Sequence, residues 1–494
     1  VTPPLVTIRR LRVTNGPIDI QPASGPRRHI NDVDFDGSVE TGASGVTVAI
    51  AHLRAVDADT GLPVTASGQV VAADDLRVRG LTLETPKSHV ELDASYRGGD
   101  APRIETTIEI ARLTLAELAP YLPASVPASL ILDGTLAATG PLTALDTSWT
   151  LHSTTVGATN GHVVVNATAA RPTVDGTIST AALNLAALSR QRDLPARLTM
   201  DGRVTATVAT DDPWQSRVAF DVRTPGLTTF GYTVGALSAT GRLDGRVLTA
   251  RGRAAAYGAA ATFDATLHDV TAPASSLRLD IAGNVQHLDL RRLPASVHAP
   301  AMATQLAGAY DVHVMPQVVQ ASFTADESDV EQAVVAAGTT ASVRIEGERL
   351  EASVDGAVHH VSDDLLHLPS EQRVDLGGPV RASVTIPNLA APFSIDAITG
   401  DVVASLGGSS VRGTTIDRAD IDGSIAGGIA TIRRLDVAGA GATVTATGTV
   451  TVSNTAAGVS DLAIEADVPD VSAIPGLPVT DASGAAHLAA QRQR

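Results

Sequence analysis

The chain has 494 residues, of which 44% are hydrophobic, 18% are charged and 3% are aromatic. These proportions are typical of a folded protein, and the chain is long enough to bury a large core. The formal net charge is −17 and no basic cluster is interleaved with aromatic residues, which excludes a typical nucleic-acid-binding surface.

Cysteine is absent, so disulfide bonds and thiolate metal sites are excluded. The chain opens with neither an initiator Met nor a signal segment, which indicates a processed form or a fragment of a longer protein. The uncharged run 438–460 reaches the length of a membrane span. Its alternating threonines would place a polar stripe in lipid, so we do not expect it to be a transmembrane helix.

Apolar and polar residues alternate through most of the chain, as in β-strands that have one half-buried face and one wet face. Strands of this kind favour an antiparallel sheet over a parallel one. We therefore predict an all-β fold, a long, curled, mostly antiparallel sheet with short helical turns. The large apolar side chains on its apolar face are, in chain order, Val90, Leu92, Ile108, Ile110, Leu198, Met200, Val204, Val208, Phe263, Leu267, Val343, Ile345, Val354, Val384, Ile386, Val444, Val450 and Val452.

Turn residues separate many of these alternating runs. Four dipeptides predict hairpins, and they are Asn15-Gly16, Asn160-Gly161, Asp244-Gly245 and Asp422-Gly423. The sequence DADTG at 57–61 resembles the start of a calcium loop but lacks the later acidic positions, so we expect an Asx-type turn. We expect Asp74-Asp75 and Asp211-Asp212 to be turn residues as well.

A longer pattern recurs across the strands. Each occurrence has a short apolar turn, a linker containing Pro and a strand around a glycine, and the occurrences are 113–140, 183–207, 288–312, 362–386 and 469–491. Their glycines are Gly134, Gly202, Gly308, Gly378 and Gly484, separated by 68, 106, 70 and 106 residues. This spacing suggests repeated strand units. No clear change of composition divides the chain, so we expect residues 1–494 to form one continuous segment.

A sheet with one apolar face must cover that face. It can close into a sandwich or barrel, stack as a solenoid, or curl into a trough that holds another molecule. The apolar positions here are often Ala, Val or Gly, as in GATVTATGTVTV at 441–452, whereas sandwich cores draw on larger side chains. Small side chains on facing walls leave space, which favours the trough.

The sequence resembles the AsmA/TamB-like family of diderm bacteria in GSIAGGIATIRRLDVAGAGATVTATGTVTV (423–452), in LRVRGLTLETPKSHVELDASY (76–96) and in the recurring units. The resemblance implies a U-shaped β-sheet, the β-taco, whose hydrophobic groove crosses the periplasm. It implies phospholipid as the cargo and anchoring in the inner membrane by an N-terminal helix. The eighteen large apolar residues named above are then the candidates that line the groove and contact the acyl chains. Neither that helix nor the C-terminal TamB domain is recognisable here, so we expect a mid-protein segment that reaches the two membranes through regions outside it.

The expected function is bridge-like phospholipid transport between the inner and outer membranes. One alternative within the family is outer-membrane protein assembly with a barrel protein as partner, through an open sheet edge. The other alternative is a passive β-solenoid, such as a surface stalk or adhesin, which would show shorter repeats and a dry interior.

Other residues are candidates for a metal or catalytic site, but their patterns do not support one. His359-His360 with Asp363-Asp364 offers metal ligands, yet adjacent side chains in a strand point to opposite faces, so we predict no metal site. The sequence contains no nucleophile elbow, HExxH, P-loop or strand-flanked GxGxxG, and we expect neither an enzyme nor a cofactor. Trp149 and Trp214 are expected to mark groove edges or to plug gaps in packing.

Overall fold

The structure is a computed structural model of the whole chain. The residues that it describes are 6–20, 28–42, 45–122, 127–184, 187, 197–209, 212, 215–229, 232–294, 302–362, 374–392, 394–411, 414–453, 460–469 and 486–493. Contacts divide the chain into two compact units, Val1–Leu248 and Thr249–Arg494, which we call unit 1 and unit 2. Each unit is described by itself, and a single continuous segment remains a prediction.

Most of the described part of unit 1 lies in strands. These are β1 (Val6–Ile20), β2 (Arg28–Gly42), β3 (Gly45–Asp57), β4 (Pro63–Ala72), β5 (Asp75–Glu84), β6 (His89–Arg97), β7 (Arg103–Thr114), β8 (Ile131–Pro141), β9 (Leu145–Ser153), β10 (Gly157–Asn166), β11 (Thr173–Asn184), β12 (Arg197–Thr207), β13 (Arg217–Thr229), β14 (Tyr232–Val234), β15 (Leu237–Asp244) and the start of β16 (Val247–Ala256). Two single-turn 3-10 helices follow β7, η1 (Leu115–Glu117) and η2 (Ala119–Tyr121).

Most of the described part of unit 2 also lies in strands. Its further strands are β17 (Ala259–Leu267), β18 (Leu279–Leu288), β19 (Thr304–Met315), β20 (Val318–Ala325), β21 (Ser328–Val330), β22 (Ala333–Val335), β23 (Thr340–Glu346), β24 (Arg349–Ser362), β25 (Asp375–Ile386), β26 (Thr399–Val411), β27 (Thr414–Ala426), β28 (Ile429–Gly439), β29 (Ala442–Thr451), β30 (Asp461–Val468) and β31 (Ala486–Gln493). Single 3-10 turns lie at η4 (Ala274–Ser276), η5 (Leu290–Arg292) and η8 (Ile395–Ala397).

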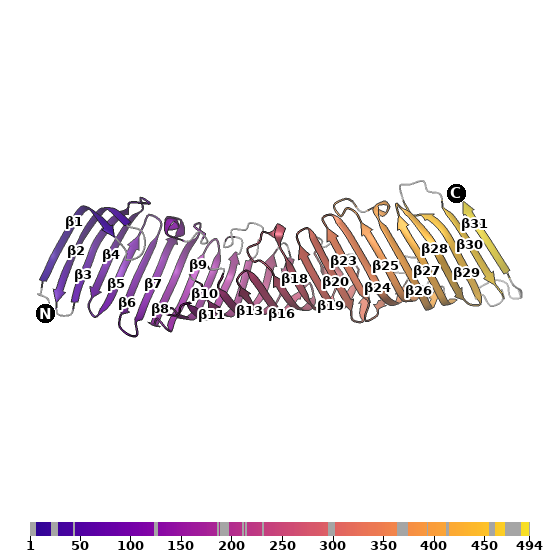
Figure 1. Cartoon of the computed structure of the whole chain (residues 1–494), viewed down its shortest axis with the longest axis horizontal. Helices are drawn as coiled ribbons and strands as arrows, with labels where there is room; N and C mark the ends of the chain where they lie inside the picture. Colours follow the sequence, from indigo (N-terminus) through magenta and orange to yellow (C-terminus); the bar gives the residue numbers. More distant parts are fainter. Residues whose placement is uncertain are drawn as a thin grey trace. The chain divides into compact units, whose positions relative to one another are not determined.

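Within each unit the strands pair antiparallel, mostly with their neighbours in the chain. In unit 1, for example, β6 lies between β5 and β7, and Figure 1 shows β2 to β7 side by side in chain order. Short strands interrupt this order at β14, β21 and β22. The prediction of an all-β, antiparallel fold with short helical turns is confirmed. None of the described residues forms a helix long and apolar enough to cross a membrane.

Four of the five predicted glycine units place the glycine opposite an apolar residue, close to a β-bulge in the partner strand. At Gly134, Gly308 and Gly378 the bulge follows the glycine pair directly, whereas at Gly202 two aligned pairs come before it. The glycine pairs are Ile110–Gly134, Ile178–Gly202, Val285–Gly308 and Val358–Gly378, and the pairs beyond the bulges are Leu113–Leu132, Leu183–Leu198, Leu288–Leu306 and Val361–Leu376. Gly484, in the fifth unit, lies outside the described residues.

The turn predictions are correct in part. Asp57 Oδ1 accepts hydrogen bonds from the backbone N–H groups of Asp59 and Thr60 at 3.1 and 2.8 Å, which confirms the Asx-type turn. Asp244 ends β15 and is followed by the turn at Gly245, as predicted. Asp74 lies in a bend, whereas Asp75 begins β5. Asp212 precedes strand β13, and Asp211 lies outside the described residues.

The other three dipeptides are not hairpins. Asn160-Gly161 lies inside β10, because its glycine faces a large side chain of the neighbouring strand rather than a turn. Asn15-Gly16 belongs to a bulge of β1, where Asn15 has a φ of 51°. Asp422-Gly423 lies inside β27, beside a bulge in its pairing with β28. At these positions, a positive φ or the small volume of glycine therefore allows a bulge or close packing between strands, not a hairpin turn.

Candidate functional site

Three rows of side chains cross unit 1 on one face of its strands. Residues that pair across neighbouring strands point to the same face, so the pairing registers trace each row. The first row is Val13, Phe35, Leu53, Ala66, Leu83, Val90, Ile110, Gly134, Leu151, Thr159, Thr180 and Met200. The second is Leu81, Leu92, Ile108, Leu136, Trp149, Gly161, Ile178, Gly202, Val222 and Ala239.

The third row of unit 1 is Ile8, Val39, Val48, Val70, Val78, Ala94, Thr106, Ala138, Thr147, Val163, Gly176, Val204, Phe220 and Gly241. In β7, Ile110, Ile108 and Thr106 belong to the first, second and third rows, so all three rows share one face. We call this face of unit 1 its apolar face.

Unit 2 has an apolar face of the same construction. One row is Ala265, Ile281, Val312, Ala321, Val343, Ala352, Val384, Gly400, Ile425, Ala430 and Val450. A second is Phe263, Gly283, Tyr310, Phe323, Ala341, Val354, Ala382, Val402, Gly423, Ile432, Gly448 and Leu462. A third, shorter row is Leu267, Leu279, Val314, Val319, Ile345, Leu350 and Ile386.

The residues predicted for the apolar face fall on these rows or next to them. Leu198 pairs with Leu183 and Leu227 on the same face, and Val444 pairs with Val437 and Ala466. Val208 and Val452 follow the ends of β12 and β29 and lie outside the strand ladders. The structure thus aligns residues far apart in sequence, within each unit, into rows that are mostly apolar and include the threonines Thr106, Thr147, Thr159 and Thr180 of unit 1. That any of them contacts lipid remains a prediction.

Glycines in the rows make room for aromatic side chains. A Cβ on Gly161 would lie 2.3 Å from the ring of Trp149, and one on Gly283 would lie 3.0 Å from the Tyr310 hydroxyl. Tyr310 reaches across Gly283 and donates a hydrogen bond from Oη to the Thr262 carbonyl at 3.0 Å. These rings therefore lie flat along the face instead of standing out from it. Trp214 lies outside the described residues.

The apolar faces are not the inside of a packed core. Among the described residues, no fully buried side chain is larger than Ser409, and the buried apolar residues are mostly Ala and Val. Val343 and Val402 of unit 2 are 37% and 38% exposed. The chain exposes 29029 Å², whereas two separate compact bodies of half its mass would together expose about 20,000 Å². The chain therefore exposes more surface than compact bodies of this mass would, and apolar side chains such as Val343 and Val402 are part of that surface.

One part of the unit 1 face is covered by η1 and η2. We call this segment, Leu115–Tyr121, the strap. Beneath it lies a pocket of about 840 Å³, lined largely by apolar side chains of β2 to β7 and of the strap, namely Ile30, Leu53, Ala55, Val64, Leu83, Val90, Ile108, Ile110, Leu113 and Leu118, with Leu62 from the turn before β4. Leu115 is itself buried against Leu130 and Val156. This volume suits a small-molecule ligand, and its lining suits an apolar one.

Polar contacts tie the strap to the sheet. Glu117 Oε2 accepts hydrogen bonds from Thr85 Oγ1 at 2.5 Å and Ser88 Oγ at 2.7 Å. The Tyr121 hydroxyl donates to the Asp57 carboxylate, and this hydrogen bond is the main reason that the pKa of Asp57 is lowered. Burial opposes ionisation of Glu117, but the hydrogen bonds outweigh it and lower its pKa. Both carboxylates are thus held ionised at neutral pH.

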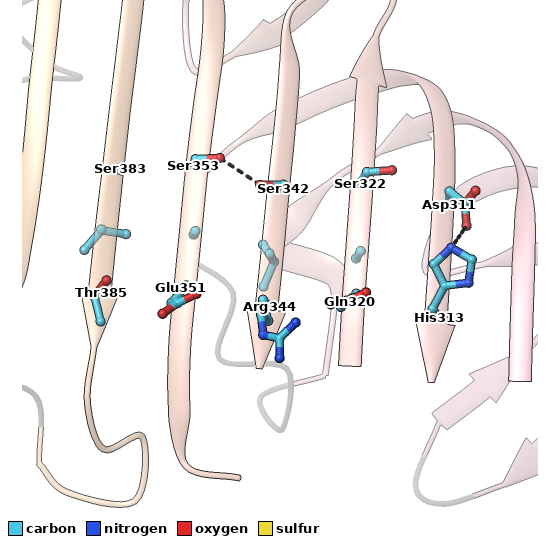
Figure 2. Close-up of a pocket in the computed structure, with 14 residues that line it drawn as sticks. Asp311, His313, Gln320, Ser322, Ser342, Arg344, Glu351, Ser353, Ser383 and Thr385 are labelled. Atoms are coloured by element: carbon cyan, nitrogen blue, oxygen red, sulfur yellow. Dashed lines mark hydrogen bonds and ion pairs between the residues drawn. The ribbon is translucent and has the colours of Figure 1, made fainter. Parts of the chain in front are cut away.

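The opposite face of unit 2 is polar and carries a shallow pocket of about 570 Å³. Figure 2 shows its side chains, which come from β19, β20, β23, β24 and β25. Ser342 and Ser353 are hydrogen-bonded at 2.7 Å, and His313 Nε2 lies 3.0 Å from Asp311. No serine hydroxyl in this pocket is hydrogen-bonded to His313 within the described residues.

A short chain of ionisable groups extends from this pocket. Asp280 lies 2.7 Å from His313 Nδ1 and 2.5 Å from His268 Nε2. The hydrogen bond with Asp280 and the charge of Asp311 raise the pKa of His313. The hydrogen bonds of both histidines lower the pKa of Asp280. These groups tie β18 and β19 to His268, the residue that follows β17, on the wet face.

The histidine pair considered as a metal site lies at a bulge. His360 has a φ of 58°, and its Nδ1 is 3.4 Å from Asp375. The neighbouring Asp363-Asp364 lies outside the described residues. Among the described residues, no three His, Asp or Glu side chains are grouped as a metal site would require.

The chain matches no known family model, no characterised protein and no solved structure. The sequence predicted a short apolar turn at the start of 113–140, but not that this turn, the strap, covers the sheet and encloses a pocket. The sequence signal for the strap is the run Leu115, Leu118 and Leu122, which has helical rather than strand spacing and interrupts the alternation after β7. Which strands it covers depends on long-range pairing.

Proposed function

We propose that the chain is a segment of a bridge that carries phospholipid between the inner and outer membranes across the periplasm, along the apolar faces of its two units. The single observation that carries this proposal is the alignment of apolar side chains in continuous, partly exposed rows on one face of each unit. The resemblance to the AsmA/TamB-like family supports the same function.

The physical argument concerns the barrier to moving a lipid through water. Exposing acyl tails costs about 0.8 kcal/mol per CH₂, so two tails of about fifteen carbons cost on the order of 20 kcal/mol. An apolar face that contacts the tails removes much of this cost. Rows of Val, Leu and Ile make no directional contacts, so a tail in contact with them moves along the face without breaking hydrogen bonds.

The two faces of the strands have different roles in this proposal. Polar and charged side chains, including ion pairs such as Arg203–Asp175 at 2.9 Å, occupy the opposite face. That face keeps the strands soluble while the apolar face holds the tails. A closed β-solenoid would instead bury its apolar rows against its own chain, and the exposed Val343 and Val402 favour the lipid-carrying function over that alternative.

The experiment is site-specific photo-crosslinking from valines on the two faces. Val204 and Val354 lie on the apolar faces, while Val164 and Val403 lie on the opposite faces and are 43% and 49% exposed. A photoreactive amino acid at each position is irradiated with the chain in phospholipid vesicles. We expect crosslinked phospholipid from Val204 and Val354 and several-fold less from Val164 and Val403. Equal labelling of both faces, or none, contradicts the proposal.

A further inference from the structure

The strap pocket differs from the rest of the unit 1 apolar face because the strap covers it. Leu118 and Tyr121 of the strap line it from one side, and Val64, Val90 and Ile108 line it from the other. A tail on the open face touches one wall, whereas a tail here touches apolar atoms on two sides. Contact on two sides buries more of the tail, so this pocket retains a tail more strongly than the open rows do.

Charged residues lie at and beside the part of the pocket that Asp57, Thr85 and Ser88 line, which we call its mouth. Asp57 lines the pocket, Asp59 follows it in the exposed turn, and Glu117 is bound to the lining residues Thr85 and Ser88. Lys87 is close enough to Glu117 to stabilise its ionised form. The three carboxylates make the electrostatic potential at the mouth negative, except near the single ammonium group of Lys87.

This charge pattern complements a zwitterion. An ammonium group is attracted by the carboxylates, while a phosphate finds Lys87 beside them. A head group that carries only negative charge meets the carboxylates without a compensating cation of its own. The mouth therefore discriminates between lipids that have the same tails but different head groups.

We propose that the strap pocket is a holding site for a zwitterionic phospholipid whose head group carries an ammonium, its tail lying under the strap and its head at the mouth formed by Asp57, Asp59, Glu117 and Lys87. This inference rests on the proposed function and deepens it by naming the lipid class and the place where a lipid pauses.

The test uses two vesicle preparations that differ only in a photoreactive lipid. One contains a phosphatidylethanolamine with a diazirine near the end of one tail, and the other contains a phosphatidylglycerol with the same tails. After irradiation of the full chain, labelled residues are mapped by mass spectrometry. We expect the phosphatidylethanolamine probe to label the pocket residues Val64, Ile108 and Leu118 at least fivefold more than the phosphatidylglycerol probe.

The matched variants are Asp59→Lys and Asp201→Lys. Both residues are exposed and in unit 1, but Asp201 lies in β12, away from the mouth. Asp59→Lys should abolish or reverse the preference at the pocket, and Asp201→Lys should leave it unchanged. Equal labelling of the pocket by the two probes overturns the proposal.

The failure of this proposal is separable from that of the proposed function. Labelling at Val204 and Val354 without labelling of the pocket overturns the holding site and leaves lipid transport standing. An absence of labelling at all these positions overturns both.

Discussion

A Cβ built on Gly134 would lie 1.9 Å from the carbonyl oxygen of Thr150 in the neighbouring strand β9. Gly134 also has a φ of +135°, which L side chains rarely adopt. Gly308 and Gly378 of unit 2 have φ values of +154° and +150° and approach their neighbouring strands in the same way. Backbone geometry therefore requires glycine next to the bulge at Gly134, Gly308 and Gly378, whereas Gly202 has no such φ.

Gly134→Ala should destabilise unit 1 because the methyl group clashes with β9 and the backbone is strained. We expect the free energy of unfolding to fall by about 2–4 kcal/mol, measured by denaturant unfolding. Gly226→Ala is the control, since Gly226 has an ordinary φ and its Cβ would lie 3.6 Å from the nearest atom. Equal losses in the two variants would show that the close approach of β8 and β9 is not the cause.

A polar substitution on the apolar face should reduce lipid binding more than stability. Val204→Asn places an amide among Gly176 and Phe220 in the third row of unit 1. Because Val204 is only partly buried, we expect a loss of about 1 kcal/mol in stability but a several-fold drop in bound phospholipid. Val164→Asn makes the same change on the opposite face and should leave bound phospholipid unchanged. A Val204→Asn chain that unfolds would indicate a packed core there.

Acid should weaken the pairing of β1 with β2. Hydrogen bonds from Arg10 and Arg12 lower the pKa of Asp36 from 3.8 to about 2. A lowered folded-state pKa gives stability that is present above pH 3.8 and is lost as the pH falls toward 2. We expect Asp36→Asn to flatten this part of the stability profile, followed by circular dichroism. Asp201→Asn, which removes a carboxylate outside any ion pair within the described residues, should retain the slope of the wild type.

The pKa of His313 should be measurable by NMR titration. Its hydrogen bond with Asp280, and then the charge of Asp311, raise it above the ordinary value of 6.5. A raised folded-state pKa gives stability that is fully present below pH 6.5 and is lost as the pH rises through the folded value. Asp280→Asn should move the titration back toward 6.5. An unchanged titration would remove Asp280 as the cause.

The strands could be predicted from the sequence, whereas their registers could not. Alternation at 90–96 and 104–110 locates β6 and β7, since it depends only on local spacing. That Leu92 lies opposite Ile108, and Ile108 opposite Leu136, depends on turn geometry and on bulges. The hairpin predicted at Asn160-Gly161 is wrong for a similar reason, because it depends on a contact between strands. Gly161 leaves space for the ring of Trp149 on the neighbouring strand instead of forming a turn.

Some features of the candidate site could likewise be predicted from the sequence, whereas others could not. The apolar parity of residues such as Val90 and Val354 follows from the sequence, and so does the shortage of large side chains. The strap over β2 to β7 could not be predicted, because its contacts join Glu117 to Thr85 and Tyr121 to Asp57 across long sequence separations. Only the paired strands bring these groups together.

The most direct test of the central claim is the number of phospholipids bound per chain, measured by native mass spectrometry after the purified chain is incubated with phospholipid vesicles and separated from them. We expect more than one phospholipid per chain, and a lower number in Val204→Asn and Val354→Asn but not in Val164→Asn or Val403→Asn. A folded chain that remains free of phospholipid would contradict the claim that these apolar faces carry lipid tails.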